Sequence, residues 1–386
     1  MNTSALKQHP FFISCPRNLE PLLLAELREL GIEGGNAEYL GVTVPLSQED
    51  VYRVVYGSRL ASRVLRPLGS FECYSSEELY SNAYAFNWSQ LIQFGQTFKI
   101  TATVSDSGIT HSHYAALKLK DAIVDSLRDQ YGERPNVDRD DPDIRIDLFL
   151  RRDQATISLY YSNGVLHRRG YRKQAVEAPI KENLAAALLR FSGWDKKQKL
   201  YDFFCGSGTL LLEAAMMATN TPAGFFRDVQ GFETLPDFDA EVWEKVKSEM
   251  DSQIVPLPQD LIFGSDIDAK SIAAFRTNLL ETPFADSIHL ERSDFNQLKG
   301  PFEDAVVVTN PPYGVRLEQG EDAILHKLYE SFGRFLKTQC PGGKACMVIP
   351  DEGLEKEIWF KPAKRLFFDN GGLEVHASLY TIRKDG

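Results

Sequence analysis

Two short motifs, separated by about a hundred residues, carry the side chains best suited to chemistry. Residues 201–209, Tyr-Asp-Phe-Phe-Cys-Gly-Ser-Gly-Thr, are typical of an apolar strand that ends in an acid and a glycine turn. Residues 307–314, Val-Val-Thr-Asn-Pro-Pro-Tyr-Gly, are typical of a buried strand that ends in a polar side chain and two prolines. Their order favours a small-molecule pocket beside a site for a second substrate.

The first motif has the composition of a ligand-binding turn. Glycines permit a tight turn and close approach of the backbone to a ligand, and the following helix presents free N–H groups there. A phosphate loop is excluded because no Gly-Lys-Ser/Thr follows, and Leu211 stands where the dinucleotide fingerprint has its third glycine. An ordinary strand-to-helix turn is the alternative. We expect this segment to bind S-adenosylmethionine through Asp202, Phe204, Cys205, Gly206, Ser207, Gly208 and Thr209.

Acids follow the next two predicted strands, and their positions suit a nucleoside. Asp266, next to Ile267, could accept hydrogen bonds from both ribose hydroxyls, while Asp268 could cap the following helix. Asp294 could accept from the adenine amine, with Phe295 against the ring; a second helix cap is the alternative for Asp294. We expect Asp266, Ile267, Asp294 and Phe295 to complete the cofactor site.

The second motif suits methyl transfer to an exocyclic amine of a base. Such an amine is a weak nucleophile because its lone pair is delocalised into the ring. The side-chain oxygen of Asn310 and the carbonyl of Pro311 could accept both amine hydrogens and stabilise the developing positive charge. Pro312 stiffens the backbone, and Tyr313 could stack on a base taken out of its helix. A merely rigid turn is the alternative. Cys205 could act as a nucleophile in carbon methylation, but its place in the cofactor turn favours a small turn residue.

Bulk properties narrow the class of protein. The net charge of −11 argues against a generally basic coat, yet residues 151–173 hold six Lys/Arg and one acid. We therefore expect RNA contacts from Arg168, Arg169 and Arg172, with salt bridges between domains as the alternative. The five cysteines are scattered, no segment is apolar enough to span a membrane, and His111 and His113 lack further ligands. We expect a cytoplasmic protein without a metal.

The order of the predicted strands and helices indicates several domains in the 386 residues. We expect an α+β unit at 1–70, in which Asn18 could cap a helix, and a second α+β unit at 71–165. From 166 to 386 strands and helices alternate, which predicts an α/β fold with a mostly parallel, doubly wound sheet. Ligands of such sheets bind at the carboxyl ends of the strands, where both motifs fall.

These motifs resemble those of bacterial 23S rRNA guanine-N2 methyltransferases, which have a ferredoxin-like region, a THUMP domain and a Rossmann-like methyltransferase domain. Residues 15–20, 166–172 and 178–185 are similar to that family's opening, junction and first methyltransferase helix, and Asn310–Gly314 matches its catalytic motif. Phe203 stands where proline is usual, which should alter the rigidity of the loop more than its contacts. The chain looks like the shorter form with one methyltransferase domain. The resemblance implies S-adenosylmethionine as cofactor, RNA as partner and N2-methylguanosine in large-subunit rRNA as product.

Three other functions remain open. A tRNA guanine-N2 methyltransferase could have the same set of domains. A DNA adenine-N6 methyltransferase uses a similar motif, although the upstream α+β units disfavour it. A non-catalytic RNA-binding assembly factor with a vestigial pocket is the alternative of a different class.

Overall fold

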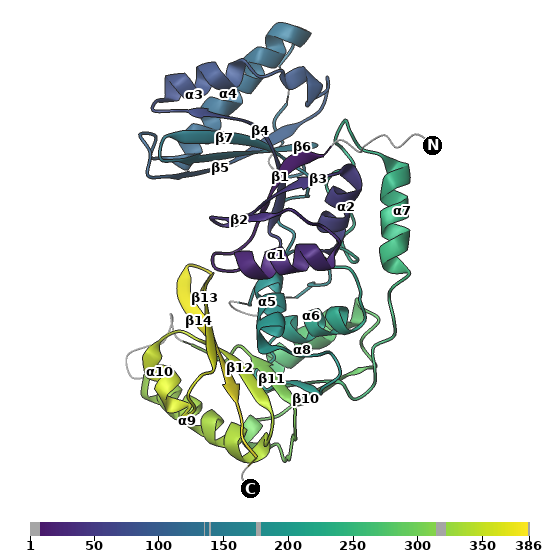
Figure 1. The fold of residues 1–386 in the computed structure, drawn as a ribbon, viewed down its shortest axis with the longest axis vertical. Helices are drawn as coiled ribbons and strands as arrows, with labels where there is room; N and C mark the ends of the chain where they lie inside the picture. Colours follow the sequence, from purple (N-terminus) through teal and green to yellow (C-terminus); the bar gives the residue numbers. More distant parts are fainter. Residues whose placement is uncertain (1–7, 135, 139, 175–178, 314–321, 385–386) are drawn as a thin grey trace.

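The computed structural model describes residues 8–384 except 135, 139, 175–178 and 314–321. Its N-terminal half is built on one seven-stranded sheet, seen in the upper part of Figure 1. The elements of this half are β1 (His9–Ser14), α1 (Glu20–Glu29), β2 (Asn36–Glu38), β3 (Gly41–Leu46), α2 (Gln48–Gly57), β4 (Arg63–Glu72), α3 (Ser76–Tyr84), η1 (Trp88–Gln90), β5 (Phe98–Ser105), α4 (Ser112–Tyr131), β6 (Ile144–Arg151) and β7 (Gln154–Tyr160).

Strand β4 joins the two predicted α+β units into this single sheet, whose order is β2-β3-β1-β4-β7-β6-β5. The first residues of β4 pair with β1, where Leu65 lies opposite Phe12. The strand then continues along β7 as far as the pair of Glu72 with Gln154. The expected division at residue 70 therefore falls inside a shared strand, and the two units are held together by backbone hydrogen bonds.

Helix α1 begins differently from expectation. Asn18 lies before the helix with a φ of 67°, the residue before the first turn is Leu19, and no side chain caps the helix. The amide of Asn18 instead donates a 3.0 Å hydrogen bond to the carbonyl oxygen of Phe367, near the C-terminus of the chain. The prediction of Asn18 as a helix cap is wrong, because its side chain links the two halves of the molecule.

The C-terminal half is the doubly wound domain that the alternating pattern predicts. Its sheet has the order β10-β9-β8-β11-β12-β14-β13, in which β14 runs antiparallel to both of its neighbours. The last two strands, absent from the sequence prediction, form a hairpin beside β12. The elements are α5 (Glu182–Ser192), β8 (Leu200–Asp202), α6 (Thr209–Ala218), α7 (Ala240–Asp251), β9 (Ile262–Asp266), α8 (Ala269–Leu280), β10 (Ile288–Arg292), η2 (Phe295–Gln297), β11 (Val306–Thr309), α9 (Asp322–Gln339), β12 (Lys344–Ile349), α10 (Glu352–Glu357), β13 (Lys364–Asn370) and β14 (Leu373–Thr381).

The central strands β8 and β11 are buried on both faces, as their continuous apolar runs predict. Alternation along the strands sends Leu200 and Val306 into a core shared with α5 and α6. Tyr201 and Val307 point to the opposite face, into a second core with the aromatic side chains of α9. Because both faces of these strands are covered by apolar side chains, polar side chains of the two motifs are found at the carboxyl ends of the strands. Both motifs therefore lie at one edge of the sheet.

Candidate active site

Pairing of β8 with β11 brings the two motifs together. The strands are parallel neighbours, with Leu200 opposite Val306 and Tyr201 opposite Val307. Their next polar side chains meet, because the hydroxyl of Thr309 donates a 2.6 Å hydrogen bond to the carboxyl of Asp202. The glycine turn and the Asn-Pro-Pro-Tyr segment therefore start from adjacent points of the same edge.

The glycine turn is held by its backbone. Gly206 and Gly208 both have positive φ, at 53° and 87°. The N–H of Gly206 donates to the carboxylate of Asp266 over 2.9 Å, which ties the turn to the end of β9. A Cβ at Gly208 would lie 2.1 Å from the ring of Phe275, so glycine is required there for conformation and for space. Helix α6 begins immediately afterwards at Thr209.

Burial sets the electrostatics of this turn. It raises the pKa of Asp202 to about 7, against the hydrogen bonds from Thr309 and the N–H of Phe204. Burial also raises the pKa of Asp266, while the N–H groups of Asp268 and Gly206 oppose that shift. The thiol of Cys205 is buried and its pKa is raised by that burial, which disfavours the reactive thiolate. Cys205 is therefore a poor nucleophile and fits a turn residue.

The acids after β9 and β10 have separate roles. Asp268 caps α8 by accepting from the N–H groups of Lys270 and Ser271, as predicted. The side chain of Asp266 is half-buried, and beside it Ile267 is 64% exposed. Asp294 accepts from the N–H of Asn296 and caps η2, which was the alternative for that position.

Phe295 lies beneath the same corner of the site. It is 4% exposed and packs in an aromatic cluster with Phe204, Phe332 and Phe335. Its ring therefore packs in the core against Phe204 of the glycine turn.

The acceptor motif leaves one buried oxygen unused. The side-chain oxygen of Asn310 is buried and has no hydrogen-bond partner among the described residues. Pro311 is buried, Pro312 is exposed and Tyr313 is half-buried. The hydroxyl of Tyr313 accepts a 2.5 Å hydrogen bond from the amide of Asn370 on β13. Gly314 lies outside the described residues.

The three candidate RNA-binding arginines lie in different environments. Arg168 is exposed and, with His167 and Lys181, lines a hollow of about 370 Å³. Burial, and then the charge of Arg169 and other nearby cations, lowers the pKa of His167 to about 4. Arg172 is half-buried and donates to the hydroxyl of Thr209 over 2.8 Å. Exposed cations therefore face this hollow next to the cofactor turn.

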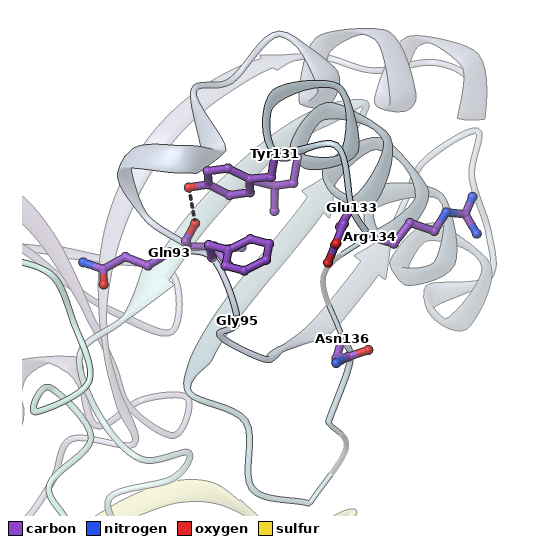
Figure 2. A pocket seen from close by; sticks show the side chains of 9 residues that line it. Gln93, Gly95, Tyr131, Glu133, Arg134 and Asn136 are labelled. Carbon is purple, nitrogen blue, oxygen red and sulfur yellow. Dashed lines mark hydrogen bonds between the residues drawn. The ribbon is translucent and has the colours of Figure 1, made fainter.

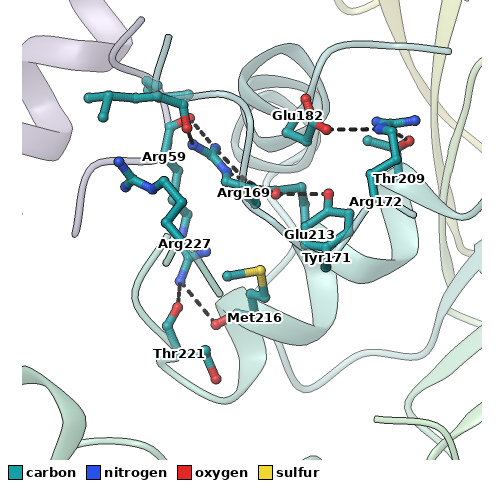
Figure 3. Close-up of polar contacts among 12 residues, drawn as sticks. Arg59, Arg169, Tyr171, Arg172, Glu182, Thr209, Glu213, Met216, Thr221 and Arg227 are labelled. Carbon is teal, nitrogen blue, oxygen red and sulfur yellow. Dashed lines mark hydrogen bonds and ion pairs between the residues drawn. The ribbon is translucent and has the colours of Figure 1, made fainter. Parts of the chain in front are cut away.

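Arg169 corrects the sequence prediction, because its side chain is completely buried. It pairs with Glu213 of α6 and donates to the carbonyl oxygens of Leu166 and Arg59 (Figure 3). No part of the guanidinium is open to a ligand. Its salt bridge lies within the domain at 166–386, and a hydrogen bond to the carbonyl oxygen of Arg59 links it to the N-terminal half.

Sequence reasoning missed Glu213, Thr309 and Asn370. Glu213 is the one acid in the otherwise apolar helix Thr209–Ala218, and a lone charge there signals a buried partner. Thr309 is the polar residue that ends a run of valines. Nothing in the local sequence signals the role of Asn370, because its partner is 57 residues away.

A second hollow, of about 90 Å³, lies in the N-terminal half between the end of α4 and residues 92–95 (Figure 2). Tyr131 closes it by donating to the carbonyl oxygen of Ile92. None of the predicted site residues lines this hollow. Across the described ranges there is no cluster of three metal-ligating side chains, and none of the described helices is long and apolar enough to cross a membrane.

Comparisons with known families match the chain in three consecutive parts. Residues 10–65 match the RlmL ferredoxin-like domain, residues 73–160 the THUMP domain and residues 169–363 the RMKL-like methyltransferase domain. The predicted order of domains is thereby confirmed, and methyltransferase domains of this fold use S-adenosylmethionine as methyl donor.

Two relatives cover nearly the whole chain. A Synechocystis protein, named provisionally as an RNA methyltransferase, is 35% identical over 373 residues, which are 97% of each chain. The ribosomal RNA large subunit methyltransferase K/L of Syntrophotalea carbinolica is 38% identical in an alignment 385 residues long, which covers 96% of this chain and 53% of the relative. The chain spans about half the length of the K/L relatives.

Solved structures agree with this fold. A protein described as a methyltransferase and crystallised with S-adenosylhomocysteine has a TM-score of 0.87 at 28% identity, covering 98% of this chain and 100% of its own. A methylase candidate from Clostridium difficile 630 has the same TM-score and coverage at 30% identity. TrmN from Thermus thermophilus, at 21% identity and a TM-score of 0.69 over 97% of this chain and 100% of its own, shares the fold. The chain therefore belongs to the RlmKL family of THUMP-containing RNA methyltransferases.

Proposed function

We propose that this protein transfers a methyl group from S-adenosylmethionine to the exocyclic N2 amine of a guanine in 23S rRNA, with the base flipped into the Asn310–Tyr313 site. The observation that carries the proposal is the buried side-chain oxygen of Asn310, which has no hydrogen-bond partner within the part of the chain that the structure describes. A buried acceptor without a partner costs about 1–3 kcal/mol, so its retention here favours a hydrogen bond made to a substrate.

The acceptor motif would activate the amine without a strong base. The oxygens of Asn310 and Pro311 accept its two hydrogens and orient the lone pair, and Tyr313 stacks on the extruded base. Pro312 keeps these carbonyls in place because it restricts the backbone. The guanine nitrogen forms a bond to the methyl carbon as the sulfur–carbon bond breaks, and it then releases one proton to water.

The residues of the turn fit the methyl donor, which supplies an electrophilic methyl group when bound. Gly206 and Gly208, both with positive φ, form the turn directly before the N-terminus of α6, where free N–H groups favour a ligand. Asp266 offers a carboxylate for the ribose hydroxyls, and the exposed Ile267 offers an apolar contact for the adenine. The remaining donor contacts in this proposal come from Asp202, Phe204, Cys205, Ser207, Thr209, Asp294 and Phe295.

The RNA would be held by the THUMP domain together with exposed cations near the site. Arg168 is open to solvent, and Arg172 contacts the first turn of α6. Recognition of this kind uses phosphates and shape, with the exposed base read in the pocket. The five cysteines are free and buried, which fits a reducing cytoplasm.

The test is nucleoside mass spectrometry on separated rRNA and tRNA from a strain that lacks the protein, after incubation with purified protein and S-adenosylmethionine. We expect N2-methylguanosine to increase in the large-subunit fraction. An increase only in tRNA would establish the tRNA alternative. A parallel incubation with DNA from the same strain tests the DNA alternative, which N6-methyladenine in that DNA would establish. Cofactor binding without transfer to any nucleic acid would favour the assembly factor.

A further inference from the structure

Helix α6, which carries the cofactor turn at its start, is held along its length by polar side chains from outside the methyltransferase sheet. Thr209 and Glu213 are four residues apart and therefore lie on one side of the helix. Arg172 donates to Thr209 over 2.8 Å, and Arg169 pairs with Glu213 over 3.1 Å (Figure 3). The junction between the two halves thus runs beside the first turns of α6.

Arg169 is the centre of this arrangement. Its guanidinium makes two bonds to the carboxylate of Glu213, at 3.1 and 3.3 Å, while the hydroxyl of Tyr171 donates to the same carboxylate over 3.1 Å. It also donates to Leu166 in the junction over 2.7 Å and to Arg59 in the N-terminal half over 2.6 Å. One buried side chain therefore joins the N-terminal half, the junction and α6.

Arg59, in the N-terminal half, also connects that half to α6. Its side chain leaves the N-terminal half and donates to the carbonyl oxygens of Met216 and Thr221 at the far end of α6. Burial lowers the pKa of Arg59 to about 10, although the charge of Glu213 acts in the opposite direction. Its own N–H donates to the carboxylate of Glu26 on α1. The far end of α6 is thereby bonded directly to the half that holds the THUMP domain, and its middle is linked to that half through Arg169.

A network of this kind adds little stability but defines geometry. Removing two charges from water costs about as much as their attraction returns, and well-packed apolar side chains would hold the halves together equally well. A bidentate guanidinium–carboxylate pair, however, is satisfied in one orientation only. The pair of Arg169 and Glu213 is therefore suited to fixing where α6 lies relative to the N-terminal half.

We propose that Arg169, acting through Glu213, is a positioning residue that aligns the methyl donor with the RNA held by the N-terminal half. This inference rests on the proposed function. The donor is bound at the start of α6 and the RNA by the other half, so the methyl carbon meets the guanine nitrogen only if both halves keep their relative placement. Misplacement by about 1 Å can cost about a hundredfold in rate.

The test compares Arg169→Lys, Glu213→Gln and the double variant with the wild-type protein. Lysine keeps the charge but cannot make the bidentate bond, and glutamine keeps the shape of glutamate without its charge. We would measure single-turnover methylation of rRNA from the deficient strain, and the affinity and stoichiometry of S-adenosylmethionine by calorimetry. We expect each single variant to lower the rate at least tenfold, with donor affinity within threefold and a stoichiometry near one. The double variant should be no slower than the slower single variant.

Arg190→Lys is the matched control, because Arg190 also joins the halves, and its ion pairs are with Glu29 and Glu26 of α1 and not with α6. It should keep its rate within threefold. An equal loss in Arg190→Lys, or an unchanged rate in Arg169→Lys, would overturn the inference. If Arg169→Lys binds well below one S-adenosylmethionine per chain, part of that variant is misfolded. The rate of Glu213→Gln then tests the inference in its place. Absence of transfer by the wild-type protein would overturn the proposed function, and this inference with it.

Discussion

The hydroxyl of Thr309 lies 2.6 Å from the carboxyl of Asp202, and both side chains are buried at the ends of adjacent parallel strands. Asp202 opens the glycine turn, and Thr309 directly precedes Asn310. The bond therefore connects the glycine turn to the Asn-Pro-Pro-Tyr segment. A shift at the end of either strand would be passed to the other motif, which would give the two proposed substrates a common frame.

Binding of S-adenosylmethionine should depend on pH through Asp202, whose pKa burial raises to about 7. The α-ammonium group of the donor favours an ionised carboxyl, so affinity should rise from pH 6 to pH 8. Without donor, the folded protein binds more protons here than the unfolded chain does between about pH 4 and 7. The free energy of unfolding should therefore fall as pH rises through that range. Calorimetry and urea unfolding would measure both effects, and Asp202→Asn, which still accepts from Thr309, should lose both.

Asp266→Ala should weaken donor binding at least tenfold. The variant would lose the proposed ribose partner and also the acceptor that holds the N–H of Gly206. Asp268→Ala is the matched control, since Asp268 only caps α8. It should cost about 1 kcal/mol of stability and leave donor affinity within threefold. Equal donor affinity in the wild-type protein and Asp266→Ala would refute the ribose contact.

Gly208→Ala should destabilise the cofactor turn far more than Gly371→Ala. Both glycines have positive φ, at 87° and 70°, so each substitution carries about 1–2 kcal/mol of backbone strain. Only at position 208 would the new Cβ also meet a ring, that of Phe275, whereas position 371 is open. Urea unfolding should show a loss of several kcal/mol for Gly208→Ala and about 1 kcal/mol for Gly371→Ala. Equal losses would show that the ring moves aside.

Asn310→Ala should nearly abolish methyl transfer, because the amine would lose the acceptor that orients its lone pair. Removal of one hydrogen-bonding group that stabilises the transition state costs about a hundredfold to a thousandfold in rate. Donor affinity should stay within a few-fold, since Asp266 and the glycine turn are unchanged. Single-turnover rates and calorimetry would separate these effects, and a fully active variant would disprove the role of Asn310.

The parts of the site that sequence could predict are local. Gly206, Gly208 and Asp268 follow from backbone conformation and helix capping within a few residues, and the structure has them as expected. The mostly parallel, doubly wound sheet follows from the alternation of strands and helices, and its carboxyl edge holds both motifs. Local pattern is sufficient here because each feature depends on neighbours along the chain.

The parts that sequence could not predict depend on distant partners. The basic cluster at 151–173 contains Arg168 and Arg169 side by side, yet one is exposed and the other is buried against Glu213, 44 residues away. Asn is a residue type that favours helix caps, but the side chain of Asn18 donates its hydrogen bond to the carbonyl oxygen of Phe367. Charge and propensity describe a residue's preferences, whereas tertiary packing decides which partner satisfies them.

Tyr313 and Asn370 should act as a unit in RNA methylation. The amide of Asn370 fixes the hydroxyl of Tyr313, and burial raises the pKa of that hydroxyl, so it remains protonated and neutral. If the bond orients the ring for stacking, Asn370→Ala and Tyr313→Phe should each slow single-turnover methylation about three- to tenfold. The double variant should be no slower than either, with donor affinity unchanged throughout. Additive losses in this double-mutant cycle would mean that the two side chains act separately.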